Sequence, residues 1–305
     1  MSTSPVVVGV DGSADARSAV LWAAAEATLA QTSLLVVHSP RLPAAEIRSG
    51  HLSTALRASD DVGQTVLNSA IALARASQPD AVVKGLLSHA DPAQALIDLS
   101  AEAQLLVLGS RSAAMGDMSL LSKRVTVSAH AHCAVLLLGP VSAFSPPSAV
   151  SRIVVGAAST RAGRAAVDFA IAEAVRRQIP LHLLRLERPV PAAAPLPRKE
   201  SIHQAENELT AQVASVGNEH PDLAVVADVA RGEAAEILPS YSDGSTILVV
   251  GCHHSDDHWS TRLGPVATSV VHRNRGAVVV VGYARDYQTR PETALAGYRL
   301  GPAHR

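Results

Sequence analysis

The stretch PVVVGVDGSADARSAVLWAAAEA, residues Pro5 to Ala27, is the best guide to the fold, because a similar stretch occurs once more in the chain. Its partner is SRIVVGAASTRAGRAAVDFAIAEA, residues Ser151 to Ala174, with Gly9 aligned on Gly156. In each copy a Val-rich run of strand length ends in a turn of small residues, and an Ala-rich helical pattern follows it. Each copy therefore predicts the opening strand, turn and helix of an α/β domain.

Further segments repeat in the same order, which predicts tandem domains of roughly 140 residues each. The pairs are QLLVLGSR (Gln104 to Arg111) with TILVVGCH (Thr246 to His253), and HCAVLLLGP (His132 to Pro140) with RGAVVVVGY (Arg275 to Tyr283). We expect domains over residues 1–142 and 150–285, followed by a C-terminal tail over 286–305. The segment VSAFSPPSAV, residues 141–150, interrupts the periodicity and is expected to join the domains.

Each half alternates short apolar runs with helical patterns. The runs are VVVGV, SLLVVHS, AVVKGLL, LLVLGS and AVLLLG in the first half, and RIVVGA, LHLLRL, AVVADV, TILVVG and AVVVVG in the second. The helical patterns lie near 14–30, 53–77, 91–102 and 119–130, and near 160–177, 198–217, 231–239 and 261–272. This alternation predicts two tandem open parallel five-stranded sheets with helices on both faces.

Composition excludes several classes of partner. The chain of 305 residues has a net charge of -1 and a pI of about 6.9, so no basic excess attracts nucleic acid or an anionic membrane. The N-terminus MSTSPVVVGVDGS lacks a basic region followed by an apolar one, and no apolar run approaches 18 residues. Two cysteines are too few for a disulfide framework. We expect a cytoplasmic protein.

The turn VDGS, residues 10–13, places a carboxylate where the first strand ends. Ligands of open α/β sheets bind beyond the carboxyl ends of the strands, so Asp11 is a candidate for contacting the base or ribose of a nucleotide, or a bridging metal. Gly12 permits a tight turn. The alternative interpretation is structural: Ser13 caps the helix that follows, and Asp11 is a solvated side chain.

The loop GSRSAAMGDMSLLSKRV, residues 109–125, follows the fourth strand and flanks the same crevice. Gly109 and the backbone N–H groups of the following helix could hold phosphate, with Arg111 beside them and the hydroxyls of Ser119 and Ser122 near the helix start. The alternative is a connection of small residues that binds nothing. No complete GxxxxGK[ST] or GxGxxG motif is present.

Two clusters resemble metal sites, HAHC (His130 to Cys133) and CHHSDDH (Cys252 to His258). Side chains next to each other in a strand point to opposite faces, and neither cluster has a second well-spaced pair of ligands, so we expect solvated polar loops and no metal site. No Ser-His-Asp or Cys-His arrangement can be assembled, and we assign no catalytic residue.

The combination of VVVGVDGS, a glycine loop after the fourth strand and HAHCAVLLLG resembles the universal stress protein family in its two-domain actinobacterial form. The resemblance covers nearly the whole chain. It implies an adenine-nucleotide-binding-like fold with strand order 3-2-1-4-5, and ATP with magnesium held through a G-x2-G-x9-G-[S/T] loop in many members. It also implies that Asp11 and the strand-two end, Val37 and His38, hold adenosine, while the loop from Gly109 and Arg111 holds phosphates.

The first half departs from the loop of that family. Counted forward from Gly109, the second glycine position is Ser112, the third is Ser122 and the hydroxyl position is Lys123. Counted backward from Cys133, the last glycine position is Leu121 and Ser122 returns to the hydroxyl position. A side chain at a glycine position obstructs close approach to phosphate, and Lys123 could supply compensating charge. Weak or rewired ATP binding is expected.

The second half departs further. Ala158 replaces the strand-one Asp, and the loop keeps only Gly251 and Gly264 at the family spacing. His254 replaces the middle glycine, Pro265 replaces the hydroxyl, and two aspartates in the loop repel phosphate. We expect this half not to bind ATP.

Two hypotheses of function follow. The first is a stress-response regulator or sensor with at most one weak ATP site, no enzymatic activity beyond very slow ATP hydrolysis, and a degenerate second domain. The second is a nucleotide-free protein–protein interaction module that has lost ATP in both domains. The resemblance also implies homodimerisation through the last strands, and the role of the Pro/Ala-rich insert at 188–204 stays open.

Overall fold

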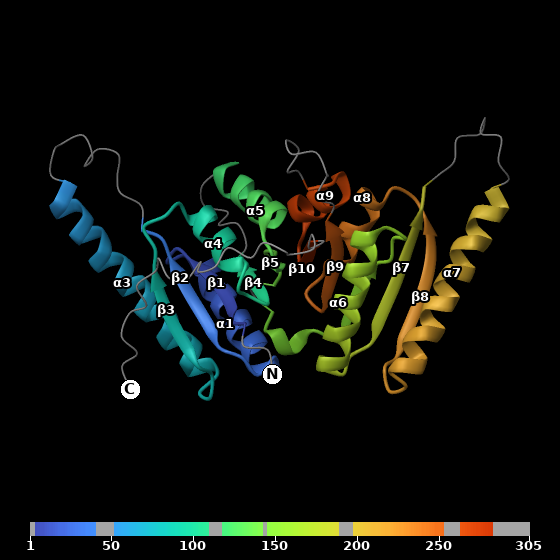
Figure 1. Ribbon diagram of the computed structural model, residues 1–305, viewed down its shortest axis with the longest axis horizontal. Coiled ribbons are helices and arrows are strands. Elements are labelled where there is room, and N and C mark those ends of the chain that lie inside the picture. Colours follow the sequence, from blue (N-terminus) through green and yellow to red (C-terminus); the bar gives the residue numbers. More distant parts are fainter. Residues whose placement is uncertain are drawn as a thin grey trace. The chain divides into compact units, whose positions relative to one another are not determined.

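The computed structural model describes residues 4–40, 52–109, 118–142, 145–188, 198–252 and 263–282. Contacts divide the chain into two compact units, one reaching Val135 and one running from Leu136 to Tyr283. Strands and helices alternate along both (Figure 1). This alternation of elements confirms the α/β fold predicted from the sequence.

The first half contains a parallel sheet in the order β3-β2-β1-β4-β5. Its strands are β1 (Val6–Val10), β2 (Leu34–His38), β3 (Val83–Leu87), β4 (Leu105–Leu108) and β5 (Ala134–Leu138). Its helices are α1 (Ala14–Leu29), α3 (Leu52–Ser77), α4 (Pro92–Ser100) and α5 (Met118–His130). Helix α1 packs beside α3, and α4 beside α5, which gives the two helical layers that cover the sheet. The order confirms the predicted 3-2-1-4-5 topology.

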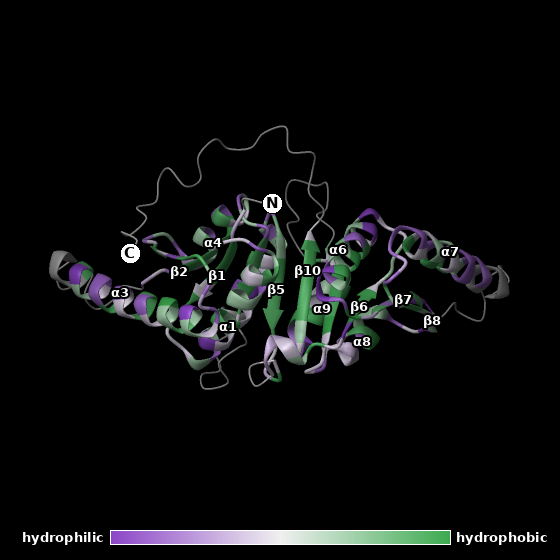
Figure 2. Cartoon of the chain, turned by 90° about the horizontal axis from the view of Figure 1, so that it is seen from below, coloured by the Kyte–Doolittle hydropathy of each residue, from purple (hydrophilic) through white to green (hydrophobic). Residues whose placement is uncertain are grey.

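The second half repeats this arrangement, since its strands lie in the order β8-β7-β6-β9-β10. The strands are β6 (Arg152–Gly156), β7 (Leu181–Glu187), β8 (Val225–Arg231), β9 (Thr246–Cys252) and β10 (Ala277–Gly282). The helices are α6 (Arg161–Arg177), α7 (Arg198–Glu219), α8 (Ala234–Ile237) and α9 (Pro265–Arg273). Figure 2 shows β10 hydrophobic along its length, while α7 alternates hydrophilic and hydrophobic residues, as expected for a helix with one solvated face.

One predicted helix is much shorter than its sequence pattern suggests. The pattern near 231–239 predicts one continuous helix, but α8 has four residues and is followed by a 3-10 turn over Leu238–Tyr241. Pro239 lacks the backbone N–H that a continuing α-helix would use, which accounts for the change of winding. Over the described part of the chain, every helix is too short or too polar to span a membrane.

Candidate functional site

The two candidate crevices lie at the carboxyl ends of the strands. In the first half, β1 pairs with β2 on one side and β4 on the other; in the second half, β6 pairs with β7 and β9. The helical connections leave these central strands toward opposite faces of the sheet, so a crevice opens between them at each carboxyl edge. The turns after β1 and β6 line these two positions.

The turn after β1 is built by Asp11, Gly12 and Ser13. Gly12 has a φ of +83°, a left-handed conformation that a residue with a side chain rarely adopts. Ser13 Oγ accepts the N–H of Ala16 at 3.1 Å, which confirms the expectation that Ser13 is the N-cap of α1. Asp11 Oδ1 accepts the N–H of Ser13 at 3.0 Å, and the carboxylate is exposed to solvent. Among the described residues, no donor reaches Asp11 Oδ2.

The end of β2 lies directly beside this turn, because Val10 is in register with His38. Nδ1 of His38 lies 2.7 Å from the carbonyl oxygen of Val10. A carbonyl only accepts, so Nδ1 carries the proton and donates it. Val37 and His38 are both buried, and the His38 carbonyl accepts the N–H of Ser88 at 2.8 Å, so the end of β2 is held in place by packing and backbone hydrogen bonds.

Gly109, predicted as a phosphate-loop glycine, has a packing role. A Cβ at this position would lie 2.8 Å from the carbonyl oxygen of Asp15 in the first turn of α1. Gly251 at the end of β9 has the same role, since its Cβ would lie 2.3 Å from the carbonyl oxygen of Ala162 in α6. Both halves therefore require glycine here for close helix–strand packing, whether or not a ligand binds.

The remaining residues of the predicted phosphate loop are only partly covered by the described structure. Arg111 lies outside the described residues. Ser119, Ser122 and Lys123 lie in α5, where Lys123 is half-exposed. Phosphate contacts in the first half stay a prediction.

The turn after β6 has different chemistry on the same frame. Ala158 stands where Asp11 does, and Ser159 stands where Gly12 does but without a positive φ. Two cavities open around this turn. One of about 420 Å³ lies between the start of α6 and the middle of α7, and one of about 560 Å³ is lined by residues of α8 and α9. Ala157, Ala158, Ser159 and Arg185 line both cavities.

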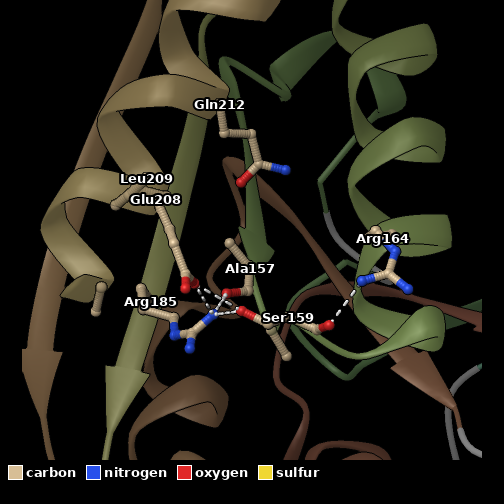
Figure 3. Close-up of a pocket in the computed structure, with 9 residues that line it drawn as sticks. Ala157, Ser159, Arg164, Arg185, Glu208, Leu209 and Gln212 are labelled. Atoms are coloured by element: carbon tan, nitrogen blue, oxygen red, sulfur yellow. Dashed lines mark hydrogen bonds and ion pairs between the residues drawn. The ribbon is translucent and has the colours of Figure 1, made fainter. Parts of the chain in front are cut away.

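Arg185 lines both cavities. Figure 3 shows its guanidinium next to Ser159 of the turn. Its Nη1 donates to Ser159 Oγ at 2.5 Å and to the carbonyl oxygen of Ala157 at 3.3 Å. Its Nε donates to Glu187 Oε1 at 2.8 Å. Glu208 of α7 completes the cluster: its Oε2 accepts the Ser159 hydroxyl at 3.0 Å and lies 4.0 Å from Arg185 Nη1. The cluster therefore fastens α7 to the β6–α6 turn.

Gly264 and Gly251 border the larger cavity of the second half. Gly264 is the N-cap of α9 and supplies no side-chain cap, and Pro265 opens the helix without an N–H. At the rim of the same cavity, Arg188 pairs with Glu233 at 3.5 Å. These charges balance one another, so this edge offers no surplus of positive charge for a phosphate.

Cys252 is buried and Cys133 is partly exposed, and for both the surroundings disfavour the thiolate. Burial raises the pKa of the Cys133 thiol to about 12 and that of Cys252 to about 11, where a hydrogen bond from the backbone of Gly264 partly offsets it. Thiolate is the nucleophilic and metal-binding form, so neither thiol is activated. Within the described ranges, no three His, Cys, Asp or Glu side chains are grouped as metal ligands.

Arg185 and Glu208 were missed in the sequence as functional residues. The repeat itself contained the evidence for Arg185: Gly9 pairs with Val37 and Gly156 pairs with Leu184, so Arg185 occupies the position of His38. A charged residue at that position was readable from the alignment of the two halves. Glu208 was not readable, because the register of a long amphipathic helix over a turn depends on packing.

Comparisons with known proteins follow the same two-part organisation. A model of the universal stress protein family matches residues 3–139 and again residues 149–282. A universal stress protein of Mycobacterium tuberculosis is 27% identical over 288 residues, covering 92% of this chain and 96% of its own. Another from the same organism is 28% identical over 290 residues, covering 90% and 96%. The crystal structure of a universal stress protein from Archaeoglobus fulgidus aligns with a TM-score of 0.65 at 14% identity, covering 93% of this chain and 98% of that one.

Proposed function

Because the chain belongs to the universal stress protein family, we propose that it is a regulatory protein that binds one adenine nucleotide, in the crevice of its first half. The observation that carries this proposal is the exposed Asp11 carboxylate at the end of β1, with one oxygen unpaired among the described residues. Gly12 leaves the backbone beside it accessible.

The adenosine half of the ligand fits the described residues. A carboxylate accepts hydrogen bonds from ribose hydroxyls or an exocyclic amine, and the β2 end at Val37 and His38, which the family resemblance assigns to adenosine, lies next to it in register. Charge-assisted hydrogen bonds of this kind are about twice as strong as neutral ones. ATP with magnesium is the ligand proposed, with the phosphates assigned to the loop from Gly109 through Lys123. No residue is assigned a catalytic role, and hydrolysis is expected to be very slow.

Calorimetric titration of ATP into the full chain and into Asp11→Ala tests this proposal. We expect one site per chain and a loss of at least about tenfold in affinity on substitution, which corresponds to about 1.4 kcal/mol. Asp168→Ala, which removes an exposed carboxylate from α6, is the charge-matched control and should bind like the unsubstituted chain.

The alternative hypothesis, a nucleotide-free interaction module, predicts a different result. The unsubstituted chain would then bind no ATP at millimolar concentration, and no nucleotide would be released when the freshly purified protein is heated. Homodimerisation through the last strands and a cytoplasmic location stay predictions, which sedimentation and fractionation would test.

A further inference from the structure

We propose that Arg185 is the residue that excludes adenine nucleotides from the second crevice, where its guanidinium and two carboxylates occupy the position of a ligand. This proposal rests on the proposed function, because it takes the first crevice as the one that binds adenosine. It adds that the cluster of Arg185, Glu187 and Glu208 is the reason the second crevice does not bind adenosine.

The position of Arg185 is the first step. His38 and Arg185 follow the strand residues that pair with Gly9 and Gly156, and both donate to the equivalent backbone carbonyl, that of Val10 or Ala157. The His38 side chain extends no further than the Val10 carbonyl. Arg185 is longer and continues to Ser159, across the turn where the first half has only Gly12.

The helix that packs over the turn also differs between the halves, with an apolar residue in the first and a charged one in the second. In the first half an added Cβ at Gly12 would lie 3.3 Å from Val66 of α3, so an apolar side chain lies beside the exposed turn. In the second half Glu208 of α7 takes this place and binds both Ser159 and Arg185. The space above the β6–α6 turn is thus crossed by polar side chains that satisfy one another.

The two equivalent pairs of positions, Asp11 with His38 and Ala158 with Arg185, differ in hydrogen-bonding character as a result. Asp11 offers acceptor oxygens to the amino and hydroxyl donors of adenosine, whereas Ala158 offers none and Arg185 presents only donors. A ligand donor placed against the guanidinium would stay unpaired. The carboxylates of Glu187 and Glu208 pair with Arg185, and that of Glu233 pairs with Arg188, so these arginines offer a phosphate little uncompensated positive charge.

Arg185 also takes up space. It lines the cavity between α6 and α7 and the cavity beside α8 and α9, so its side chain fills space next to both. Its replacement by a shorter residue is expected to enlarge them. Exclusion therefore has a steric part and a hydrogen-bonding part.

The test restores the first-half pair in the second half and measures adenosine, which has no phosphate. All variants are full-length chains that carry Asp11→Ala, so the first crevice contributes little to the signal. They are the Asp11→Ala parent, Ala158→Asp, Arg185→His, and the combination of Ala158→Asp with Arg185→His. Equilibrium dialysis with labelled adenosine gives affinity and stoichiometry, and circular dichroism with a thermal melt verifies folding.

We expect the parent and Ala158→Asp to leave adenosine unbound at millimolar concentration, because an added carboxylate next to Arg185 pairs with it. The combination should bind one adenosine at least about tenfold more tightly than Ala158→Asp alone. The matched control combines Ala158→Asp with Arg188→His, which removes a rim arginine paired with Glu233, and it should gain nothing.

Three outcomes would overturn the inference: Ala158→Asp alone binding as well as the combination, the Arg188→His control gaining equally, or a folded combination binding no better than the parent. If Arg185→His prevents folding, Arg185→Gln replaces it, since Gln keeps donors near Ser159 and Ala157 while removing the cation. A chain without Asp11→Ala that binds no ATP would refute the proposed function but leave this comparison of second-crevice variants interpretable.

Discussion

The turns after β1 and β6 have the same kind of helix cap and the same close glycine contact, but they carry different polar side chains. Both follow a central strand, both are capped by a hydroxyl residue, and both pack against a glycine at the end of β4 or β9. The first turn contains the exposed carboxylate of Asp11 and the left-handed Gly12. The second turn is bound by Arg185, which pairs with two glutamates. We infer that the shared helix cap and glycine serve folding, whereas the residues that differ between the two turns determine what can bind.

The largest expected effect tests the shared part of the frame. Gly251→Ala should destabilise the chain by about 3 kcal/mol, because its Cβ would meet the Ala162 carbonyl at 2.3 Å. Gly109→Ala, with 2.8 Å to the Asp15 carbonyl, should cost about 1–2 kcal/mol. Urea unfolding measures both. Gly217→Ala, a helical glycine with nothing within 4 Å, is the control and should stabilise slightly.

If Gly251→Ala were tolerated within about 0.5 kcal/mol, the packing account of these glycines would be wrong. The glycine in the first half would then be explained better by approach of a ligand. A loss in both halves means that a glycine after the fourth strand cannot by itself be used to infer phosphate binding.

The second effect separates the two strand-two residues. His38→Ala removes a buried ring and its bond to the Val10 carbonyl, and should cost about 2 kcal/mol. Arg185→Ala should cost about 1 kcal/mol, because its side chain is 21% exposed and solvent screens the ion pairs it leaves. Thermal unfolding of both variants checks the order.

His38→Asn is the conservative partner in this experiment, since its amide N–H can occupy the place of Nδ1. It should recover part of the stability lost in His38→Ala. A larger loss for Arg185→Ala than for His38→Ala would show that the arginine cluster is the main structural support of the second half, contrary to its partial exposure.

The third effect concerns the caps, where the two halves should agree. Ser13 Oγ accepts from Ala16 N–H at 3.1 Å and Thr160 Oγ1 accepts from Gly163 N–H at 3.0 Å. Ser13→Ala and Thr160→Ala should each cost about 1 kcal/mol in denaturant unfolding. Values that differ by more than about 1 kcal/mol would mean that the turns contribute unequally to helix formation.

The fold could be predicted from the sequence because hydrophobic periodicity and the repeat are local features. The ten strands, including β1 and β6, were readable as apolar runs, and family resemblance supplied the strand order. The site was predicted only in part. Gly109 was interpreted through its chemistry, although its neighbour Asp15 is far from it in sequence. Contacts between distant segments, such as Arg185 with Glu208, arise from packing that periodicity does not encode.

The smallest effect is a pH dependence that Asp243 is expected to give the second half. Asp243, just before β9, lies 3.2 Å from Arg152 and accepts the N–H and hydroxyl of Ser245. Burial alone would raise the pKa of this carboxyl, but the hydrogen bonds from Ser245 and Thr246 and the charge of Arg152 outweigh it and hold the pKa below its usual value.

A carboxyl whose pKa is lowered by folding contributes stability above its unfolded pKa of about 3.9, and loses it as the pH falls through the folded value. Because Asp243 and Arg152 are both nearly half exposed, the contribution should be less than about 1 kcal/mol. Asp243→Asn should therefore lower stability at pH 7 and have no effect at pH 2, as measured by thermal unfolding across that range.

The first half has Ala101 in the corresponding place before β4, so Ala101→Gly, which shortens a side chain without removing charge, should shift stability equally at both pH values. An equal pH dependence in Asp243→Asn and the unsubstituted chain would show that this carboxyl does not distinguish the halves.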